Sequence, residues 1–373
     1  MNKKKLSILI YSLDKGGAER VTSIIINELI FNYDITLILM NQTINYPIPK
    51  NLHIKYIERS NPPESGIIKL LKLPLLGYKY KKVCEENNID VSLSFTNRPN
   101  YINIFAKLFG NKVRTIINER AMPSLQHKYG FKGFINRFLI KALYPKADAI
   151  IGNSKGNSFD LRKKFMIDKV ETIYNPVNVM KNVKKKKDST FTFITVGRLD
   201  KGKNHSLLIS AMQYINAQLL IIGDGILKVN LEEQINKLNL NDKVFLLGLQ
   251  NDPFKYFETA DAFIFTSNHE GFPNALLEAL AYGLPIISTD CKSGPREILA
   301  PNTDFRIVLK NDIEVAKYGI LIPINNKTNL IKAMKIMMTN RGLYNKYKEN
   351  SLTRSHDFDK DVIMKKYIKV IEN

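Results

Sequence analysis

The chain of 373 residues is predicted to be an α/β protein made of two doubly wound, Rossmann-like domains. Strand-like apolar runs alternate with amphipathic helical stretches, as expected for parallel sheets with helices on both faces. The charged segment 181–189 interrupts this alternation, which then starts again. A chain of this length also exceeds what one compact core usually holds.

The first predicted domain spans residues 1–180 and contains short strand-like runs separated by helical stretches. The run 6–13 follows the basic segment 1–5 and imitates a signal peptide. Its apolar part is short, and it ends at Asp14 and Gly16 instead of a small-residue cleavage site, so a buried first strand is expected. The strands expected in this domain are 6–13, 34–41, 52–57, 89–95, 112–117 and 148–153, with helices at 18–31 and 76–87.

The second predicted domain spans residues 190–355, and its carboxyl strand ends are expected to face a cleft shared with the first domain. The amphipathic segment 358–371 is expected to form a helix that packs back on the first domain. Asp357, Asp359 and Asp361 are interpreted as caps of that helix. The strands expected here are 190–196, 217–222, 243–247, 262–266, 285–288 and 319–322, with helices at 204–214 and 226–238.

Cysteine content and hydropathy indicate a cytosolic setting. Cys84 and Cys291 are the only cysteines, and neither belongs to a metal-binding or redox pair. No apolar run approaches the roughly 20 residues that a membrane span requires.

Charge is distributed unevenly along the chain. Residues 1–187 carry a net charge of +19 and residues 188–373 a net charge of +2. This asymmetry points to an anionic partner for the first domain. No nucleic-acid-binding module is recognisable, so nucleic acid is not expected.

Two segments favour a membrane partner, because 66–82 and 131–144 both resemble basic amphipathic helices. The alternative is that each packs its apolar face on the domain core and leaves its lysines in water. The lysines assigned to the acceptor or to an anionic, inner membrane face are Lys69, Lys72, Lys79, Lys81 and Lys82.

The most informative stretch is 268–297, which places Glu270 and Glu278 around the start of a helix. Pro273 suits the first helical position and Gly283 ends the helix. Glu270 follows a strand, at the edge where open α/β sheets bind ligands. Backbone amides there suit a phosphate, and carboxylates suit sugar hydroxyls. The simpler alternative is a solvated Glu278 and a loop-capping Glu270.

Three further loops follow predicted strands. Gly16 and Gly17 open a helix and let the backbone approach a phosphate. The loop 197–204 contains Arg198 and Lys203, a planar fork and a point charge suited to a diphosphate. The turn 223–225 is expected to let a flat base lie against the backbone.

Together these motifs resemble the retaining glycosyltransferases of family 4, which have the two-domain GT-B fold. The resemblance covers nearly the whole chain. More narrowly, the chain is similar to bacterial members that add α-1,4-linked N-acetylgalactosamine to a lipid-linked saccharide. The segments that carry this narrower resemblance are 10–13, 37–41, 98–102, 143–148, 153–157 and 292–294.

The resemblance implies a role for each site residue. Arg198 and Lys203 would hold the diphosphate of a UDP-sugar, Glu270 would reach the transferred sugar, and Glu278 would bind the ribose. The acceptor, a polyprenyl-diphosphate saccharide, would bind the first domain. The residues assigned to donor binding are Gly16, Gly17, Gly197, Gly223, Asp224, Gly225, Gly271, Phe272, Asn274 and Glu278.

One departure concerns catalysis. Many family members have a histidine in the first domain that points at the reacting centre, whereas this chain has Asn118, Glu119 and Arg120 there. Either Glu119 or Arg120 could take part of that role, and Glu119 is the candidate catalytic residue named beside Arg198, Lys203 and Glu270. The five histidines have no metal-ligand spacing, and neither a metal nor another cofactor is expected.

Two other classes stay open. A sugar-nucleotide epimerase of the same architecture would use a similar diphosphate site, but it would turn over UDP-sugar without an acceptor. A non-catalytic protein that binds membranes or nucleic acid would explain the basic first half. It would leave the cluster in the second domain unexplained.

Overall fold

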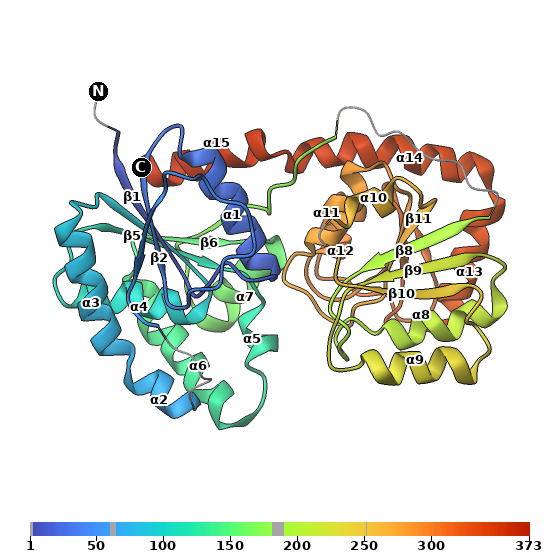
Figure 1. Cartoon of the computed structure of the whole chain (residues 1–373), viewed down its shortest axis with the longest axis horizontal. Coiled ribbons are helices and arrows are strands. Elements are labelled where there is room, and N and C mark those ends of the chain that lie inside the picture. Colours follow the sequence, from blue (N-terminus) through green and yellow to red (C-terminus); the bar gives the residue numbers. More distant parts are fainter. Residues whose placement is uncertain (1–2, 60–64, 181–189, 251) are drawn as a thin grey trace. The chain divides into compact units, whose positions relative to one another are not determined.

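The computed structural model describes residues 3–59, 65–180, 190–250 and 252–373 (Figure 1). It divides into two compact units, Met1–Pro176 with Lys360–Asn373, and Val177–Asp359. The link at 181–189 lies outside the described residues. The boundary between the two units lies before this link, after Pro176. Val177 already belongs to the second unit, where its backbone N–H donates to the carbonyl of Phe358 at 2.9 Å.

The first unit contains a seven-stranded sheet in the order β3-β2-β1-β4-β5-β6-β7. Every neighbouring pair is parallel. The predicted strands are all present, and the three-residue strand β7 was not predicted. The strands are β1 (Lys5–Ile10), β2 (Asp34–Leu39), β3 (His53–Tyr56), β4 (Val91–Phe95), β5 (Arg114–Glu119), β6 (Ala149–Gly152) and β7 (Val170–Thr172).

Helices cover both faces of this sheet (Figure 1). In β1, Leu6, Ile8 and Ile10 point to one face and Leu9 to the other, because side chains alternate along a strand. Helices α1 and α15 cover the first face; α3, α4, α6 and α7 cover the second. The helices of this unit are α1 (Gly17–Leu29), α2 (Gly66–Leu71), α3 (Leu73–Glu86), α4 (Asn97–Leu108), α5 (Pro123–Gln126), α6 (Gly130–Leu143), α7 (Lys155–Phe165) and α15 (Lys360–Glu372).

The C-terminal helix α15 belongs to the first unit. Its buried side chains Ile363, Tyr367 and Val370 lie in the same core cluster as β1. The amide of Asn118 donates a hydrogen bond to the Tyr367 hydroxyl at 2.6 Å, which ties α15 to the end of β5. Asp357 lies inside the short 3₁₀ turn His356–Phe358, before α15 begins, and its carboxylate pairs with Arg354 at 2.5 Å. Asp357 therefore does not cap α15.

The basic segment 66–82 is not one helix. Helix α2 ends at Leu71 and α3 begins at Leu73, with Lys72 between them. Pro74 lies in the first turn of α3, where its missing N–H is tolerated, but it could not continue a longer helix without losing a hydrogen bond. The apolar and lysine positions on either side of the break therefore follow two separate helices.

The second unit repeats the architecture with the sheet order β10-β9-β8-β11-β12-β14-β13, in which only β13 is antiparallel to its neighbour. The two-residue strand β13 was not predicted. The strands are β8 (Thr192–Val196), β9 (Gln218–Ile222), β10 (Val244–Gly248), β11 (Ala262–Phe265), β12 (Ile286–Thr289), β13 (Glu314–Val315) and β14 (Ile320–Ile322).

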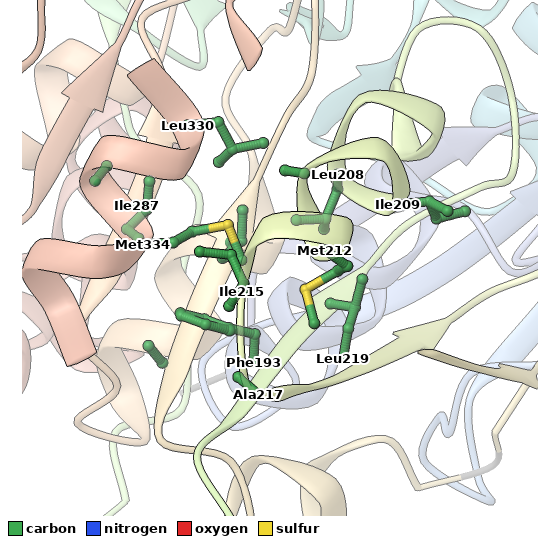
Figure 2. Close-up of a cluster of buried hydrophobic side chains, with 14 of the residues drawn as sticks. Phe193, Leu208, Ile209, Met212, Ile215, Ala217, Leu219, Ile287, Leu330 and Met334 are labelled. Carbon is green, nitrogen blue, oxygen red and sulfur yellow. The ribbon is translucent and has the colours of Figure 1, made fainter. Parts of the chain in front are cut away.

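One core cluster joins this sheet to its helices, and Figure 2 shows Phe193 and Ile287 of the sheet facing Leu208 of α8 and Met334 of α13. Pro273 precedes α11 as its N-cap instead of occupying the first helical position. The helices are α8 (His205–Ala211), α9 (Lys228–Lys237), α10 (Phe254–Phe257), α11 (Asn274–Ala281), α12 (Pro295–Leu299), α13 (Lys327–Thr339) and α14 (Arg341–Ser355). None of the helices in the described part of the chain combines the length and apolarity needed to cross a bilayer.

Candidate donor site in the second unit

The candidate site lies at the carboxyl ends of β8, β9, β11 and β12. These strands lie in the contiguous part β9-β8-β11-β12 of one parallel sheet, so the loops that follow them meet at one edge. The loops are 197–204, 223–225, 266–273 and 290–294. The sequence predicted the first three of these loops as ligand-binding segments.

Glycines bring the first two loops into contact. A Cβ atom at Gly223 would lie 1.9 Å from the carbonyl oxygen of Gly197, and one at Gly225 would lie 2.5 Å from that of Leu199. The backbone N–H of Leu199 donates to the carbonyl of Asp224 at 2.9 Å. Backbone atoms of the neighbouring loop therefore fill the space that a side chain would need at Gly223 and Gly225, so this contact accounts for both glycines. The expected base near this turn stays a prediction.

Lys203 and Glu270 form the central charged pair, although 67 positions separate them. Lys203 Nζ lies 2.5 Å from Glu270 Oε1, and the two side chains are 23% and 14% exposed. The ammonium also lies 5.1 Å from the ring centroid of Phe265. The pair is therefore partly shielded from water but still open at the sheet edge.

Arg198 is the exposed cation of the site. Its side chain is 81% exposed, and its guanidinium lies 3.5 Å from the carboxylate of Asp200. An exposed pair at this distance constrains a long side chain weakly. Arg198 is therefore free to take up an anion that reaches the loop.

Hydrogen bonds fix the backbone that carries Lys203. Asp200 accepts bonds from the N–H groups of Gly202 and Lys203, at 2.9 and 3.1 Å. Thr266 Oγ1 donates to the carbonyl of Lys203 at 2.9 Å. The N–H of Asn268 donates to the carbonyl of Gly202 at 2.8 Å. The loops on β8 and β11 therefore form one unit.

The buried His205 follows this loop at the start of α8. Its side chain is 3% exposed, and burial lowers its pKa to about 4, with Lys203 acting in the same direction. The imidazole is therefore neutral at physiological pH. A neutral ring beside Lys203 avoids a second positive charge in the same partly buried place.

Glu278 is buried on α11, with 6% of the residue exposed, so the interpretation of a solvated helix residue is wrong. Phe272 is also buried, and its ring packs 5.7 Å from that of Phe358. Gly271 precedes it, and Asn274 is the first residue of α11. Phe272 was predicted to contact the donor, but its packing on Phe358 accounts for its position without a ligand.

A buried ionic cluster that the sequence did not reveal lies behind this segment. Arg296 bonds to Asp290 at 2.7 Å and to Glu314 at 2.9 Å, and the Arg296 side chain is 4% exposed. Burial raises the pKa of Asp290 against the lowering effect of Arg296. Asp290 also accepts the N–H of Leu309 at 2.8 Å. The position of Asp290 directly after β12 was the one available signal.

The turn after Asp290 supports the loop that carries Glu270. Ser293 Oγ donates to the carbonyl of Gly271 at 2.5 Å. Gly294 has φ +95°, and a Cβ atom there would lie 2.4 Å from Pro273. Burial raises the pKa of the Cys291 thiol, which also feels the charges of Glu270 and Lys203. The turn 290–294 therefore packs against residues 271–273, which directly follow Glu270.

The remaining predicted site residues belong to the first unit. Gly16 is the N-cap of α1 and Gly17 its first residue. A Cβ atom at Gly16 would lie 2.0 Å from a carboxylate oxygen of Glu19, which therefore covers this glycine. An anion at this helix start would have to share the space with Glu19.

Glu119 lies in the interior at the end of β5, with 1% of the residue exposed. Its carboxylate accepts hydrogen bonds from the Tyr144 hydroxyl at 2.7 Å, Asn97 at 3.1 Å and the N–H of Arg120 at 2.9 Å. Burial raises its pKa, although these bonds oppose the shift. Glu119 thus holds the backbone after β5, and its carboxylate is not exposed at the sheet edge.

The five lysines of the basic segment differ in their surroundings. Lys72 lies 3.5 Å from Glu58, and Lys81 lies 3.5 Å from Glu85. Lys82 lies over the ring of Tyr78 at 5.0 Å. Lys79 is exposed and Lys69 is half-buried. The positive surface therefore depends most on Lys79 and Lys82.

Within the described ranges, no three His, Cys, Asp or Glu side chains gather where they could hold a metal ion. The carboxylates of the site are instead engaged with cations, as in the pairs Lys203–Glu270 and Arg296–Asp290.

Two Rossmann-like units, each built on a seven-stranded and mainly parallel sheet, are the architecture of the GT-B glycosyltransferases. The Anabaena protein HepE in complex with UDP and glucose has the same fold, with a TM-score of 0.76 at 17% identity and 99% of both chains covered. Residues 177–354 match the family model "Glycosyl transferases group 1".

The sequence comparisons extend this match beyond the second unit. The chain is 41% identical, over 99% of both proteins, to N-acetylgalactosamine-N,N'-diacetylbacillosaminyl-diphospho-undecaprenol 4-alpha-N-acetylgalactosaminyltransferase of Campylobacter jejuni. It is 24% identical, over 98% of both, to a second C. jejuni alpha-1,4-N-acetyl-D-galactosaminyltransferase, which acts on a diNAcBac-PP-undecaprenol glycan. The chain therefore belongs to the group 1 glycosyltransferases.

Proposed function

We propose that the protein transfers N-acetylgalactosamine from UDP-GalNAc to an undecaprenyl-diphosphate-linked saccharide, with retention and with formation of an α-1,4 linkage. The observation that carries this proposal is the 41% identity over 99% of both chains to the C. jejuni diphospho-undecaprenol 4-alpha-N-acetylgalactosaminyltransferase. The setting we propose is the inner face of the cytoplasmic membrane, where such an acceptor is held by its lipid.

The leaving diphosphate is assigned to Arg198 and Lys203. Cleavage of the bond between the anomeric carbon and the diphosphate builds negative charge on the leaving oxygens. Two cations on a preorganised loop stabilise that charge, and the N–H groups near Gly271 add to it. In support, Arg198 is 81% exposed at this edge, and the backbone around Lys203 is held by Asp200.

The Lys203–Glu270 pair would change partners when the donor binds. In the free protein, Glu270 neutralises Lys203 at 2.5 Å. A diphosphate arriving beside Lys203 would weaken that pair, and the Glu270 carboxylate would then accept hydrogen bonds from sugar hydroxyls. Glu278, which is buried on α11, is assigned to the ribose hydroxyls.

The remaining assignments concern the base, the acceptor and the metal. The base is placed near Gly223–Gly225 and the strand residues 244–246, and the saccharide acceptor on the basic first unit. No metal is needed in this scheme, because the cations of the protein neutralise the diphosphate. The leaving phosphate would take the proton of the acceptor hydroxyl on the same face of the sugar.

The test is to incubate the protein with a panel of UDP-sugars and a polyprenyl-diphosphate saccharide. The expected result is transfer from UDP-GalNAc alone, with an α-1,4 linkage in the NMR spectrum of the product. Conversion of UDP-sugar without acceptor would instead indicate an epimerase. A β linkage would overturn retention, and transfer from a different UDP-sugar would overturn the assignment of the donor.

A further inference from the structure

Helix α6 of the first unit exposes three aromatic side chains along one stripe. Phe131, Phe134 and Phe138 are 77%, 61% and 64% exposed. Their spacing places them on one side of the helix, because residues three, four and seven positions apart share a face. Large apolar side chains gathered on an exposed face mark a contact surface.

The opposite side of α6 packs on the core of the first unit. Gly133, Ile140 and Leu143 are the buried positions. A Cβ atom at Gly133 would lie 2.7 Å from the carbonyl oxygen of His127, and Arg137 donates to the carbonyl of Lys128 at 3.1 Å. Helix α6 therefore packs one apolar side on the core, as the core-packing interpretation for 131–144 expected. The three phenylalanines lie outside that contact.

Positive charge surrounds the phenylalanine stripe. Lys128, Lys132 and Lys141 are exposed, and the sequence from 120 to 147 contains no aspartate or glutamate. Lys128 also lies 4.7 Å from the ring centroid of Tyr129, which is 78% exposed. Exposed aromatic rings beside flexible lysines match the interface of an anionic lipid membrane, with rings below the headgroups and ammonium groups among them.

A second apolar stripe lies on the same side of the first unit. Ile67 and Leu71 of α2 and Leu75 of α3 are 69%, 73% and 55% exposed. Helices α3 and α6 pack on the same face of the sheet through one core cluster, so their outer sides both point away from that face. In Figure 1, α2 and α6 both lie in the lower part of this unit.

We propose that α6 inserts Phe131, Phe134 and Phe138 into the headgroup–acyl boundary of an anionic membrane, while Lys128, Lys132 and Lys141 contact the lipid headgroups. The proposal deepens the proposed function, because the lipid of the acceptor would lie in the same membrane. It goes beyond the lysines of the segment 66–82, because it assigns the apolar part of the membrane attachment to a different helix.

A second copy of the chain fits this surface poorly. A symmetric contact through α6 would bring the same face of each copy together. The exposed lysines of one copy would then oppose those of the other without an acidic side chain in the segment to pair with them. An anionic lipid surface satisfies both the rings and the lysines.

The chain contains no tryptophan, so one introduced tryptophan reports its own surroundings. Phe134→Trp should shift its fluorescence to the blue on mixing with phosphatidylglycerol–phosphatidylcholine vesicles, and brominated lipid should quench it. Phe31→Trp is the matched control, because Phe31 is 75% exposed at the end of α1 on the other face of the sheet. Its emission should stay unchanged.

Removing the rings should weaken binding in the otherwise unchanged protein. The triple variant Phe131→Ala, Phe134→Ala, Phe138→Ala should bind the vesicles about 100-fold more weakly, roughly fivefold per ring. The control Phe31→Ala, Tyr214→Ala removes exposed rings elsewhere and should change binding less than about twofold, since neither ring would enter the bilayer. Thermal melting checks that both variants fold. Both are expected to fold, because the substituted side chains are exposed and make little core contact.

Two results would overturn the proposal. One is a folded Phe134→Trp protein that binds vesicles without a shift or quenching. The other is a blue shift that appears without vesicles and grows with protein concentration, which would indicate a second copy. Neither readout needs a donor or an acceptor, so insertion without GalNAc transfer would refute the proposed function alone, and transfer without insertion would refute only this proposal.

Discussion

Lys203 and Arg198 are assigned the same task at the leaving group, yet their surroundings predict different responses to substitution. Each replacement by alanine should slow transfer by about a hundredfold, because each removes a charge-assisted contact to the diphosphate. Lys201→Ala is the matched control. Lys201 is an exposed lysine in the same loop, and its contact there is made by its backbone carbonyl with Asn268.

Stability should separate the two variants. Lys203→Ala leaves the carboxylate of Glu270, only 14% exposed, without the ammonium at 2.5 Å. Removing one partner of a shielded pair costs about 1–3 kcal/mol, or roughly 2–4 °C in melting temperature per kcal/mol for a unit of this size. Arg198 is 81% exposed, so Arg198→Ala should change stability by less than about 0.5 kcal/mol.

The assay combines single-turnover transfer with thermal melting. The double variant Lys203→Met, Glu270→Gln should regain most of the lost stability, since it leaves neither charge unpaired, and should remain inactive. Wild-type turnover in folded Arg198→Ala or Lys203→Ala would remove this loop from the mechanism. An equal loss in Lys201→Ala would show that the loop acts only through its net charge.

Three further outcomes are expected. Activity should survive excess EDTA, because protein cations neutralise the diphosphate; complete loss that Mg²⁺ or Mn²⁺ restores would contradict this. Replacing five lysines of the segment 66–82 with glutamine should weaken binding to anionic vesicles at low salt and raise the acceptor KM, while the donor KM stays near its original value. A folded variant that binds like the parent would make this segment ordinary surface. The variant changes Lys69, Lys72, Lys79, Lys81 and Lys82. The buried neutral His205, with its pKa lowered from 6.5 to about 4, should make the protein less stable as pH falls from 6.5 toward 4, by about 2 kcal/mol at pH 5, because only the unfolded chain takes up the proton. Melting curves of His205→Gln at pH 7 and pH 5 should lack that part of the slope, and an unchanged slope would assign it to other groups.

Local pattern was sufficient for the fold and for the placing of the candidate loops at strand ends. Apolar runs that alternate with helical stretches predicted β1 and its neighbours, and turn residues such as Gly283 predicted where helices end. Both signals depend on residues close in sequence. The meeting of these loops at one edge was predictable because parallel strands place their following loops together. Short strands such as β7 and β13 lacked enough residues to give a pattern.

Contacts between distant segments were decided only by tertiary structure. The sequence placed Lys203 and Glu270 in separate ligand loops, but packing made them partners across 67 positions. Glu119 followed a predicted strand like a site residue, yet Tyr144 and Asn97 enclose its carboxylate. Burial depends on which element packs on a side chain, and a local pattern does not record that.

The phenylalanines of α6 illustrate the same division. Their spacing predicted an apolar helical face from sequence alone. The same spacing describes a helix packed on a core and one that turns its rings to the surroundings, because periodicity defines a face without defining its neighbour. Only the packing of Gly133, Ile140 and Leu143 on the domain determined that Phe131, Phe134 and Phe138 point outward.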